Sequence, residues 1–181
     1  DGDGGIPLYS KRGDEPMIPA SMSKLMLYYM TFERIKAGRL TMTDEFSVSE
    51  HAWRTGGAGT DGSTMFLPLN SKVSVQDLLK GAIIVSGNDA CIVLAEGLFG
   101  SEEAYARAAT ARAKELGMTG STFANSTGLD APTHRMSAHD IATIAFRLIK
   151  DFPEYYPMFR EPEFTFNNTR EYNRNPLLRQ L

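Results

Sequence analysis

The chain has 181 residues, of which 42% are hydrophobic and 23% are charged, proportions typical of a globular domain with one sizeable core. Its formal net charge of -3 provides no basic excess for nucleic acid or an anionic membrane surface, so we expect no nucleic-acid partner. No run reaches the roughly 18 apolar residues that a membrane span needs. The one cysteine, Cys91, cannot form an internal disulfide and is predicted to be a small buried hydrophobic residue.

The N-terminal part of the chain is predicted to be extended. Residues 1–5 are acidic and glycine-rich and do not resemble a signal peptide, so we expect any such signal to have been removed. Residues 6–10 are typical of a strand, and a turn at 11–14 and the prolines Pro16 and Pro19 follow. The first helix is then expected to end at Gly38, because glycine suits the position after a helix C-terminus.

Ser21 and Lys24 lie three residues apart at the start of this helix, so the lysine amine can reach the serine hydroxyl from the same face. Apolar residues surround the helix on nearly every side, and such a helix belongs in a core. Burial lowers the pKa of a lysine, and the neutral amine could take the serine's proton. Alternatively, Ser21 caps the helix and Lys24 snorkels, since chance alone gives about one S-x-x-K in a chain of this size.

The rest of the chain is predicted to be mainly helical. Residues 41–71 are expected to form short strands and loops, and helices are expected over about 74–86, 88–98, 101–116 and 137–150. Residues 164–166 and the pair Asn167-Asn168 predict an extended segment followed by a turn. Residues 57–62 match G-x-G-x-x-G, but no strand precedes them and no helix follows, so we interpret them as a mobile loop at a cleft mouth.

Ser86-Gly87-Asn88 falls between two predicted helices, where polar side chains can point into a cleft. A carboxamide there could donate to a substrate carbonyl while it accepts a hydrogen bond from Lys24. Alternatively, Ser86 or Asn88 only caps the next helix. The three histidines lack the spacing of metal ligands, so we expect neither a metal nor another cofactor.

Taken together, these motifs resemble those of a known family. Pro19-Ala20-Ser21-Met22-Ser23-Lys24 and Ser86-Gly87-Asn88 match the first two signatures of penicillin-binding proteins. Residues 126–130, 137–140 and 164–167 continue the likeness in the same order, over nearly the whole chain. The sequence is similar to the low-molecular-mass penicillin-binding proteins, the serine-type D-alanyl-D-alanine carboxypeptidases. The resemblance implies an α+β, β-lactamase/transpeptidase-like fold, with a helical subdomain and part of an antiparallel sheet.

The same resemblance implies roles for individual residues. Ser21 would be the acylated nucleophile, with its backbone amide as one oxyanion donor, and Lys24 would be its base. Ser86 would help to relay a proton to the leaving group, and Asn88 would orient the substrate. Arg174 matches an arginine near the side that binds the substrate carboxylate, although a solvated surface charge is the alternative.

The implied function is that of a cell-envelope hydrolase, periplasmic or extracytoplasmic, which removes the terminal D-alanine from peptidoglycan stem pentapeptides and is acylated by β-lactams. A D,D-endopeptidase, a β-lactamase and a noncatalytic β-lactam-sensing module are the alternatives. The family's third motif, Lys-Thr-Gly, does not occur in residues 1–181. We therefore expect these residues to be the N-terminal and helical portion of the peptidase domain, with the remaining strands, any C-terminal β-domain and a possible membrane anchor in polypeptide beyond Leu181.

Overall fold

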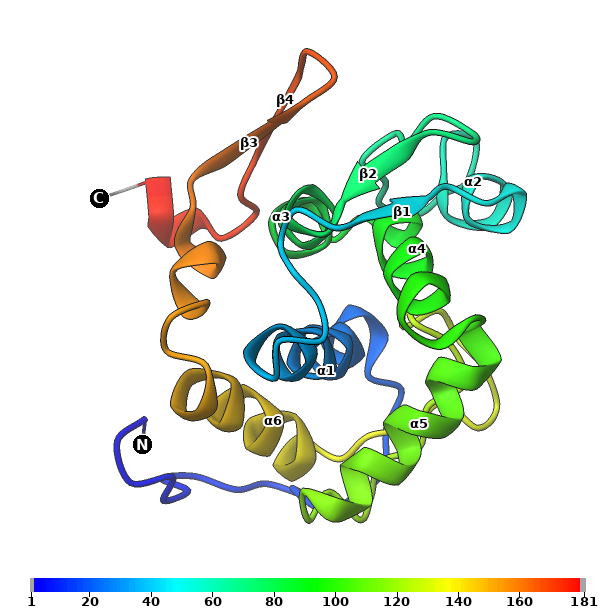
Figure 1. Ribbon diagram of the computed structural model, residues 1–181. Helices are drawn as coiled ribbons and strands as arrows, with labels where there is room; N and C mark the ends of the chain where they lie inside the picture. The colour runs from blue at the N-terminus through cyan, green and yellow to red at the C-terminus, as the bar shows by residue number, and fades with distance from the viewer. Residues whose placement is uncertain (1, 180–181) are drawn as a thin grey trace.

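The computed structural model describes residues 2–179, in which one helix, α1 (Lys24–Lys36), is surrounded by the others (Figure 1). It contacts α4 (Asn88–Phe99), α5 (Glu102–Glu115) and α6 (Ala138–Asp151). The remaining elements are the 3-10 turns η1 (Ala20–Ser23), η2 (Tyr156–Arg160) and η3 (Pro176–Arg179), helices α2 (Glu50–Gly56) and α3 (Val75–Val85), and strands β1 (Glu45–Ser47), β2 (Lys72–Ser74), β3 (Glu163–Phe166) and β4 (Thr169–Tyr172). No helix within this described range has the length and apolar character needed to cross a bilayer.

Helix α1 is central because it has no polar face over its first two turns. Every residue from Met26 to Phe32 is buried, and from Glu33 onward the helix is partly or fully exposed. The neighbouring α4 is similarly apolar, with buried residues from Asn88 to Ala95. Helix α1 packs against α4, α5 and α6, and α4 packs also against α2 and α3, so most of their side chains are removed from water. This burial is the main stabilising term available to them.

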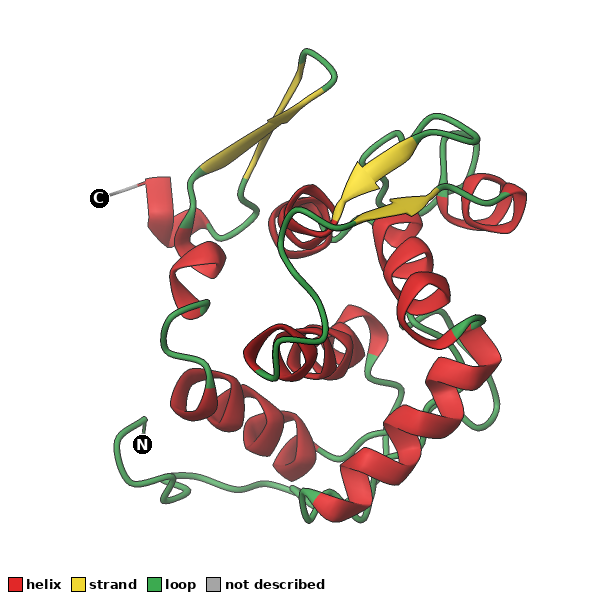
Figure 2. Cartoon of the chain, viewed as in Figure 1, coloured by secondary structure: helices red, strands yellow, loops and turns green. Residues whose placement is uncertain are grey.

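The strands form two small antiparallel pairs on one side of the helices (Figure 2). In the first pair, β1 and β2 place Phe46 opposite Val73. In the second pair, β3 and β4 form a hairpin whose turn residues, Asn167 and Asn168, have φ angles of 46° and 62°. Asparagine tolerates this left-handed region better than most residues, which explains the tight two-residue turn that the sequence predicts.

Most predicted helices are confirmed by their capping contacts. The side chains of Ser74, Ser101 and Ser137 each accept a hydrogen bond from the amide three residues later, at the start of α3, α5 and α6. Gly38 and Gly117 follow helices α1 and α5 with φ angles of 68° and 81°. Serine at the first position and glycine after the last are therefore reliable signals in this chain.

Two sequence-based predictions are wrong. Residues 41–71 contain a helix, α2, in addition to the predicted loops and strand, and Ser49 caps it by accepting from the Ala52 amide. Seven residues are too few to show a helical period, so the packing of α2 against α4 decides its structure. Residues 6–10 form no strand; they are exposed and lie along α6 near Phe146.

Candidate active site

Ser21 and Lys24 lie where the 3-10 turn η1 passes into α1. Ser21 is exposed, whereas the Lys24 side chain reaches into the protein and is only 1% exposed. The Lys24 Nζ lies 3.3 Å from the Ser21 Oγ, so the predicted proximity of amine and hydroxyl is confirmed. An accessible hydroxyl therefore lies beside a buried amine, and the snorkelling alternative for Lys24 is wrong.

The segment between α3 and α4 supplies the other polar neighbours of Lys24. The Lys24 Nζ lies 2.7 Å from the Ser86 carbonyl oxygen, 2.8 Å from the Ser86 Oγ and 2.8 Å from the Asn88 Oδ1. Ser86 has a left-handed backbone with φ of 60°. This irregular residue ends α3 and turns both of its oxygens toward the amine. The three residues Ser21, Ser86 and Asn88 thus converge on one nitrogen.

The types of these four oxygens suit a neutral amine. The Ser86 carbonyl and the Asn88 Oδ1 can only accept, whereas the hydroxyls of Ser21 and Ser86 can accept or donate. A neutral lysine has two N–H groups, which the two obligate acceptors can take, and one lone pair, which can then face a hydroxyl. In this arrangement the Ser21 O–H can point at the lone pair, as proton removal requires.

Burial lowers the pKa of Lys24, because the ammonium form loses its hydration. The positive charge of Arg174 lowers this pKa further, whereas the negative charge of Asp89 raises it. A Cys91 thiolate would also raise the pKa of Lys24, and by more than Asp89 does. Burial raises the pKa of Cys91 itself to about 11, however, so at neutral pH its thiol is uncharged and this effect is lost. Cys91 is fully buried, as the sequence predicts.

Asn88 is held between Lys24 and the predicted glycine-rich loop. Its Oδ1 accepts from Lys24, and a Cβ added to Gly62 would lie 2.5 Å from its Nδ2. Glycine at position 62 therefore lets the loop approach the carboxamide closely. The Asn88 backbone amide donates to the Ser63 carbonyl at 2.7 Å, which fixes the same loop to the start of α4.

The backbone before Ser21 has a conformation that the sequence does not predict. Ala20 has a φ angle of 49°, a region that costs a residue with a Cβ about 1 kcal/mol or more. Gly128, with φ of 85°, packs directly on it: a Cβ there would lie 2.0 Å from the Ala20 carbonyl oxygen and 2.9 Å from the Ser21 nitrogen. Gly128 therefore packs against, and supports, the turn that carries Ser21.

Arg174 is the least closely integrated of the predicted site residues. It is exposed, and its positive charge lowers the pKa of Lys24. The preceding residue, Asn173, is buried and donates from its Nδ2 to the carbonyls of Phe159 and Glu161. This anchor fixes the backbone from which the arginine side chain projects.

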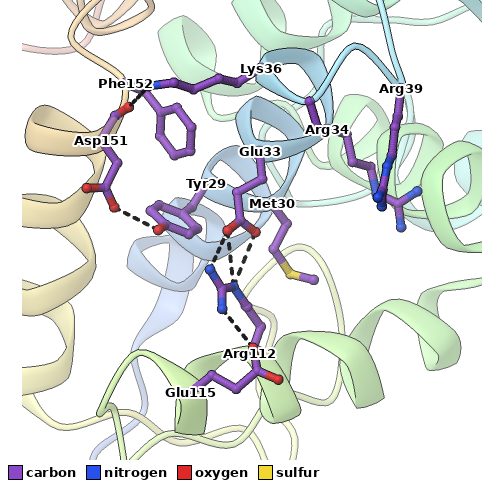
Figure 3. Close-up of a pocket in the computed structure, with 11 residues that line it drawn as sticks. Tyr29, Met30, Glu33, Arg34, Lys36, Arg39, Arg112, Glu115, Asp151 and Phe152 are labelled. Carbon is purple, nitrogen blue, oxygen red and sulfur yellow. Dashed lines mark hydrogen bonds and ion pairs between the residues drawn. The ribbon is translucent and has the colours of Figure 1, made fainter.

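A large hollow, of about 740 Å³, lies at the other end of α1 (Figure 3). Its charged groups largely satisfy one another: Arg112 bridges Glu33 and Glu115, and the Tyr29 hydroxyl donates to Asp151. It contains none of the predicted site residues. In the described residues, no group of three or more His, Cys, Asp or Glu side chains is placed to hold a metal ion.

Two contributors to the site were not assigned a role from the sequence. Gly128 acts on Ala20 across more than one hundred residues, and Asp89 contacts the loop that touches Asn88. Asp89 had a weak signal, since a carboxylate inside the apolar run of α4 must find hydrogen-bond donors. The left-handed φ of Ala20 had no signal in the sequence, because alanine does not favour the left-handed conformation.

Comparison with known proteins agrees with this geometry. The family described as D-alanyl-D-alanine carboxypeptidase, Peptidase S11, matches residues 1–181. The D-alanyl-D-alanine carboxypeptidase DacC of Escherichia coli is 45% identical over 175 residues, which are 96% of this chain and 44% of DacC. DacF of Bacillus subtilis is 40% identical over 82% of this chain and 37% of its own length.

Solved structures give the same result. Penicillin-binding protein 5 of Haemophilus influenzae superposes with a TM-score of 0.93 at 38% identity, covering 99% of this chain and 52% of that one. Penicillin-binding protein 6B of Escherichia coli gives a TM-score of 0.88 at 35% identity, over 94% and 54%. The predicted α+β, penicillin-binding-protein fold is confirmed. The chain spans about half the length of these relatives, and it belongs to the D-alanyl-D-alanine carboxypeptidase family.

Proposed function

We propose that the protein containing this chain is a serine D,D-carboxypeptidase, with Ser21 as nucleophile and Lys24 as its base. The observation that supports this most directly is the buried Lys24 Nζ, 3.3 Å from the exposed Ser21 Oγ. Membership of the D-alanyl-D-alanine carboxypeptidase family supports a substrate that ends in D-Ala-D-Ala, and we propose peptidoglycan stem peptides as that substrate. No metal or cofactor is needed for the steps below.

The reaction begins with proton transfer from Ser21 to the neutral amine of Lys24. The Ser21 oxygen attacks the carbonyl carbon of the penultimate D-alanine, and the charge that develops on the carbonyl oxygen is stabilised by backbone amides, that of Ser21 among them. Lys24 returns the proton through the Ser86 hydroxyl to the departing nitrogen. The C–N bond breaks, free D-alanine leaves, and an ester to Ser21 remains.

Water completes the reaction. It loses a proton to Lys24 and attacks the ester carbonyl, and the Ser21 oxygen recovers a proton as the shortened peptide leaves. Asn88 holds the substrate amide through its Nδ2 while its Oδ1 stays bound to Lys24, and Arg174 attracts the terminal carboxylate. A β-lactam follows only the first half of this path, because its opened ring stays attached and hinders water. The resulting ester is then long-lived.

The family also suggests a location and the rest of the domain. The relatives are named penicillin-binding proteins and D-alanyl-D-alanine carboxypeptidases. Because we propose peptidoglycan as the substrate, we also propose the bacterial cell envelope as the location. The chain spans less than half of the curated relatives it matches, and we propose that further strands of the same peptidase domain complete the cleft.

The test uses the full-length gene product. It should release D-alanine from a pentapeptide ending in D-Ala-D-Ala, and mass spectrometry after penicillin treatment should place the adduct on Ser21. Ser21→Ala should lose both reactions. Ser10→Ala, which changes an exposed serine outside the group formed by Ser21, Lys24, Ser86 and Asn88, should keep them. Normal turnover by Ser21→Ala, or an adduct at another residue, would refute the assignment.

The alternatives have distinct outcomes in the same assays. An Escherichia coli D-alanyl-D-alanine endopeptidase is 30% identical over 75% of this chain, so cross-linked dimers should be offered beside the pentapeptide. Faster cleavage of the dimer would favour an endopeptidase. Rapid penicillin turnover would indicate a β-lactamase, and a stable adduct without any release of D-alanine would indicate a β-lactam-sensing module.

A further inference from the structure

We propose that Asp89 is a positioning residue, which fastens the segment Ser63–Leu67 across the start of α4 and thereby sets the orientation of Asn88. We call residues 63–67 the strap. The proposal rests on the proposed function, because Asn88 matters only if Lys24 and Ser21 perform acyl transfer. Asp89 itself touches neither of the reacting atoms and acts through its neighbour.

The Asp89 carboxylate binds the strap with both oxygens. Its Oδ1 accepts from the Met65 amide at 3.0 Å, and its Oδ2 accepts from the Leu67 amide at 3.0 Å. The Thr64 hydroxyl donates to Oδ2 at 2.7 Å and in turn accepts from the Phe66 amide at 3.1 Å. Three successive backbone amides are therefore satisfied, directly or through Thr64, by one carboxylate.

The backbone of the strap is shaped for this anion. Phe66 has a φ angle of 61°, which turns the amides on either side of it toward the same carboxylate. Successive amides around a left-handed residue form a concave anion site. Phe66 is itself exposed, so side-chain packing does not explain its unfavourable conformation. The hydrogen bonds from the Met65 and Leu67 amides to Asp89 explain this conformation.

Burial makes these contacts strong. Asp89 is completely buried, and within residues 2–179 it forms no ion pair. The loss of water around such a carboxylate must be offset by hydrogen bonds, and bonds to an ionised acceptor are about twice as strong as neutral ones. Besides the strap, Asp89 accepts from the Ala90 amide in the first turn of α4, where the helix dipole favours a negative charge.

Asn88 is attached to the same strap. Its backbone amide donates to the Ser63 carbonyl, and Gly62, immediately before the strap, lies against its Nδ2. Helix α2 also approaches this turn closely, since a Cβ added to Gly56 would lie 2.5 Å from the Asp89 amide nitrogen. The first turn of α4 is thus enclosed by α2 and the strap. Without the Asp89 carboxylate, the strap loses its hydrogen bonds from Thr64, Met65 and Leu67, and the segment that lies against Asn88 is no longer held in place.

The test compares acylation rates of the full-length protein with fluorescent penicillin, well below the unfolding temperature. Asp89→Asn keeps the shape but replaces an acceptor oxygen with a donor, and we expect a fall of about 10- to 100-fold in the second-order rate. Asp140→Asn is the matched control, because Asp140 is a buried first-turn aspartate of α6 that accepts from Ser121 at 2.7 Å, away from the cluster. It should change the rate by less than about threefold.

A double-mutant cycle distinguishes positioning from a general structural role. If Asp89 acts through Asn88, then adding Asp89→Asn to Asn88→Ala should cost less than about threefold, because the group to be positioned is gone. Equal losses in both backgrounds would overturn the proposal, as would a loss equal to that of the Asp140 control. If Asp89→Asn does not fold, Thr64→Val removes one donor of the strap and should lower the rate by about three- to tenfold only when Asn88 is present. A wild-type protein that penicillin does not acylate at Ser21 would refute the proposed function instead.

Discussion

Gly128→Ala should disable the proposed nucleophile with little change elsewhere in the protein. The added Cβ would lie 2.0 Å from the Ala20 carbonyl oxygen, 2.4 Å from the Ala20 carbonyl carbon and 2.9 Å from the Ser21 nitrogen. All three are backbone atoms, which no side-chain rotation can move aside. To restore even a tight contact of about 3 Å, the Ala20 carbonyl must retreat by about 1 Å.

This displacement is transmitted to the chemistry, because the next atom in the chain is the Ser21 nitrogen. A misplacement of about 1 Å lowers the rate of an enzyme reaction by about a hundredfold. We therefore expect the acylation rate with fluorescent penicillin to fall by about two orders of magnitude. Alanine in the left-handed region costs a further 1–2 kcal/mol, approximately, in unfolding free energy, because Gly128 has a φ of 85°.

Gly117→Ala separates the two effects. Gly117 has a φ angle of 81°, so alanine there suffers the same backbone strain, but a Cβ at this position has nothing within 4 Å. In thermal denaturation, both variants should lose stability through the same backbone strain, and Gly128→Ala should lose more because of its steric clash. If the acylation rate of Gly128→Ala is within about threefold of that of Gly117→Ala, the packing of Gly128 against Ala20 does not position Ser21.

Three other predictions concern charge and burial. The acylation rate should rise with pH as Lys24 loses its proton, with a midpoint below the ordinary lysine pKa. Arg174→Gln removes a positive charge that lowers the pKa of Lys24, so it should move this midpoint to higher pH. Identical pH profiles for the two proteins would contradict this prediction. Cys91 should resist a thiol reagent at pH 8 in the folded protein and react after denaturation, since it is buried and its pKa is about 11; rapid labelling of the folded protein would be contrary evidence. Glu102→Gln should lower the unfolding free energy by about 1–2 kcal/mol, because Glu102 accepts from the Ser126 amide at 3.0 Å and also from its hydroxyl; an unchanged thermal midpoint would argue against this contact.

The sequence predicts best what is decided within one turn of chain. The caps Ser74, Ser101 and Ser137 act on amides three residues away, and the distance between Ser21 and Lys24 is fixed by the same short spacing. Helix α2 was missed because it is short and depends on packing against α4. The strand predicted at residues 6–10 is absent, since an extended apolar segment pairs only where a partner strand is present.

The long-range parts of the site could be anticipated only through the family resemblance or not at all. Ser86 and Asn88 lie more than sixty residues from Lys24, and no local pattern brings them to its amine. The family resemblance predicts that they share one site with Lys24, and their contacts with its amine at 2.8 Å confirm that these side chains meet. Gly128 lies within the motif at residues 126–130, and Asp89 directly follows Ser86-Gly87-Asn88, but most of their contacts are with backbone atoms. A motif of residue types does not describe backbone contacts.

The division between buried and exposed parts explains how one site can be both reactive and rigid. Lys24 is fixed by the core, since it belongs to the buried face of α1, whereas Ser21 lies one turn earlier on the exposed 3-10 turn. A base that must stay neutral needs burial, and a nucleophile that must meet a peptide needs access. A continuous α-helix exposed to solvent would serve the second need but not the first. The left-handed residues Ala20 and Ser86 reconcile the two needs. Ala20 begins the 3-10 turn that carries Ser21, and Ser86 ends α3 and turns both of its oxygens toward the Lys24 amine. The surrounding core offsets the strain of both residues.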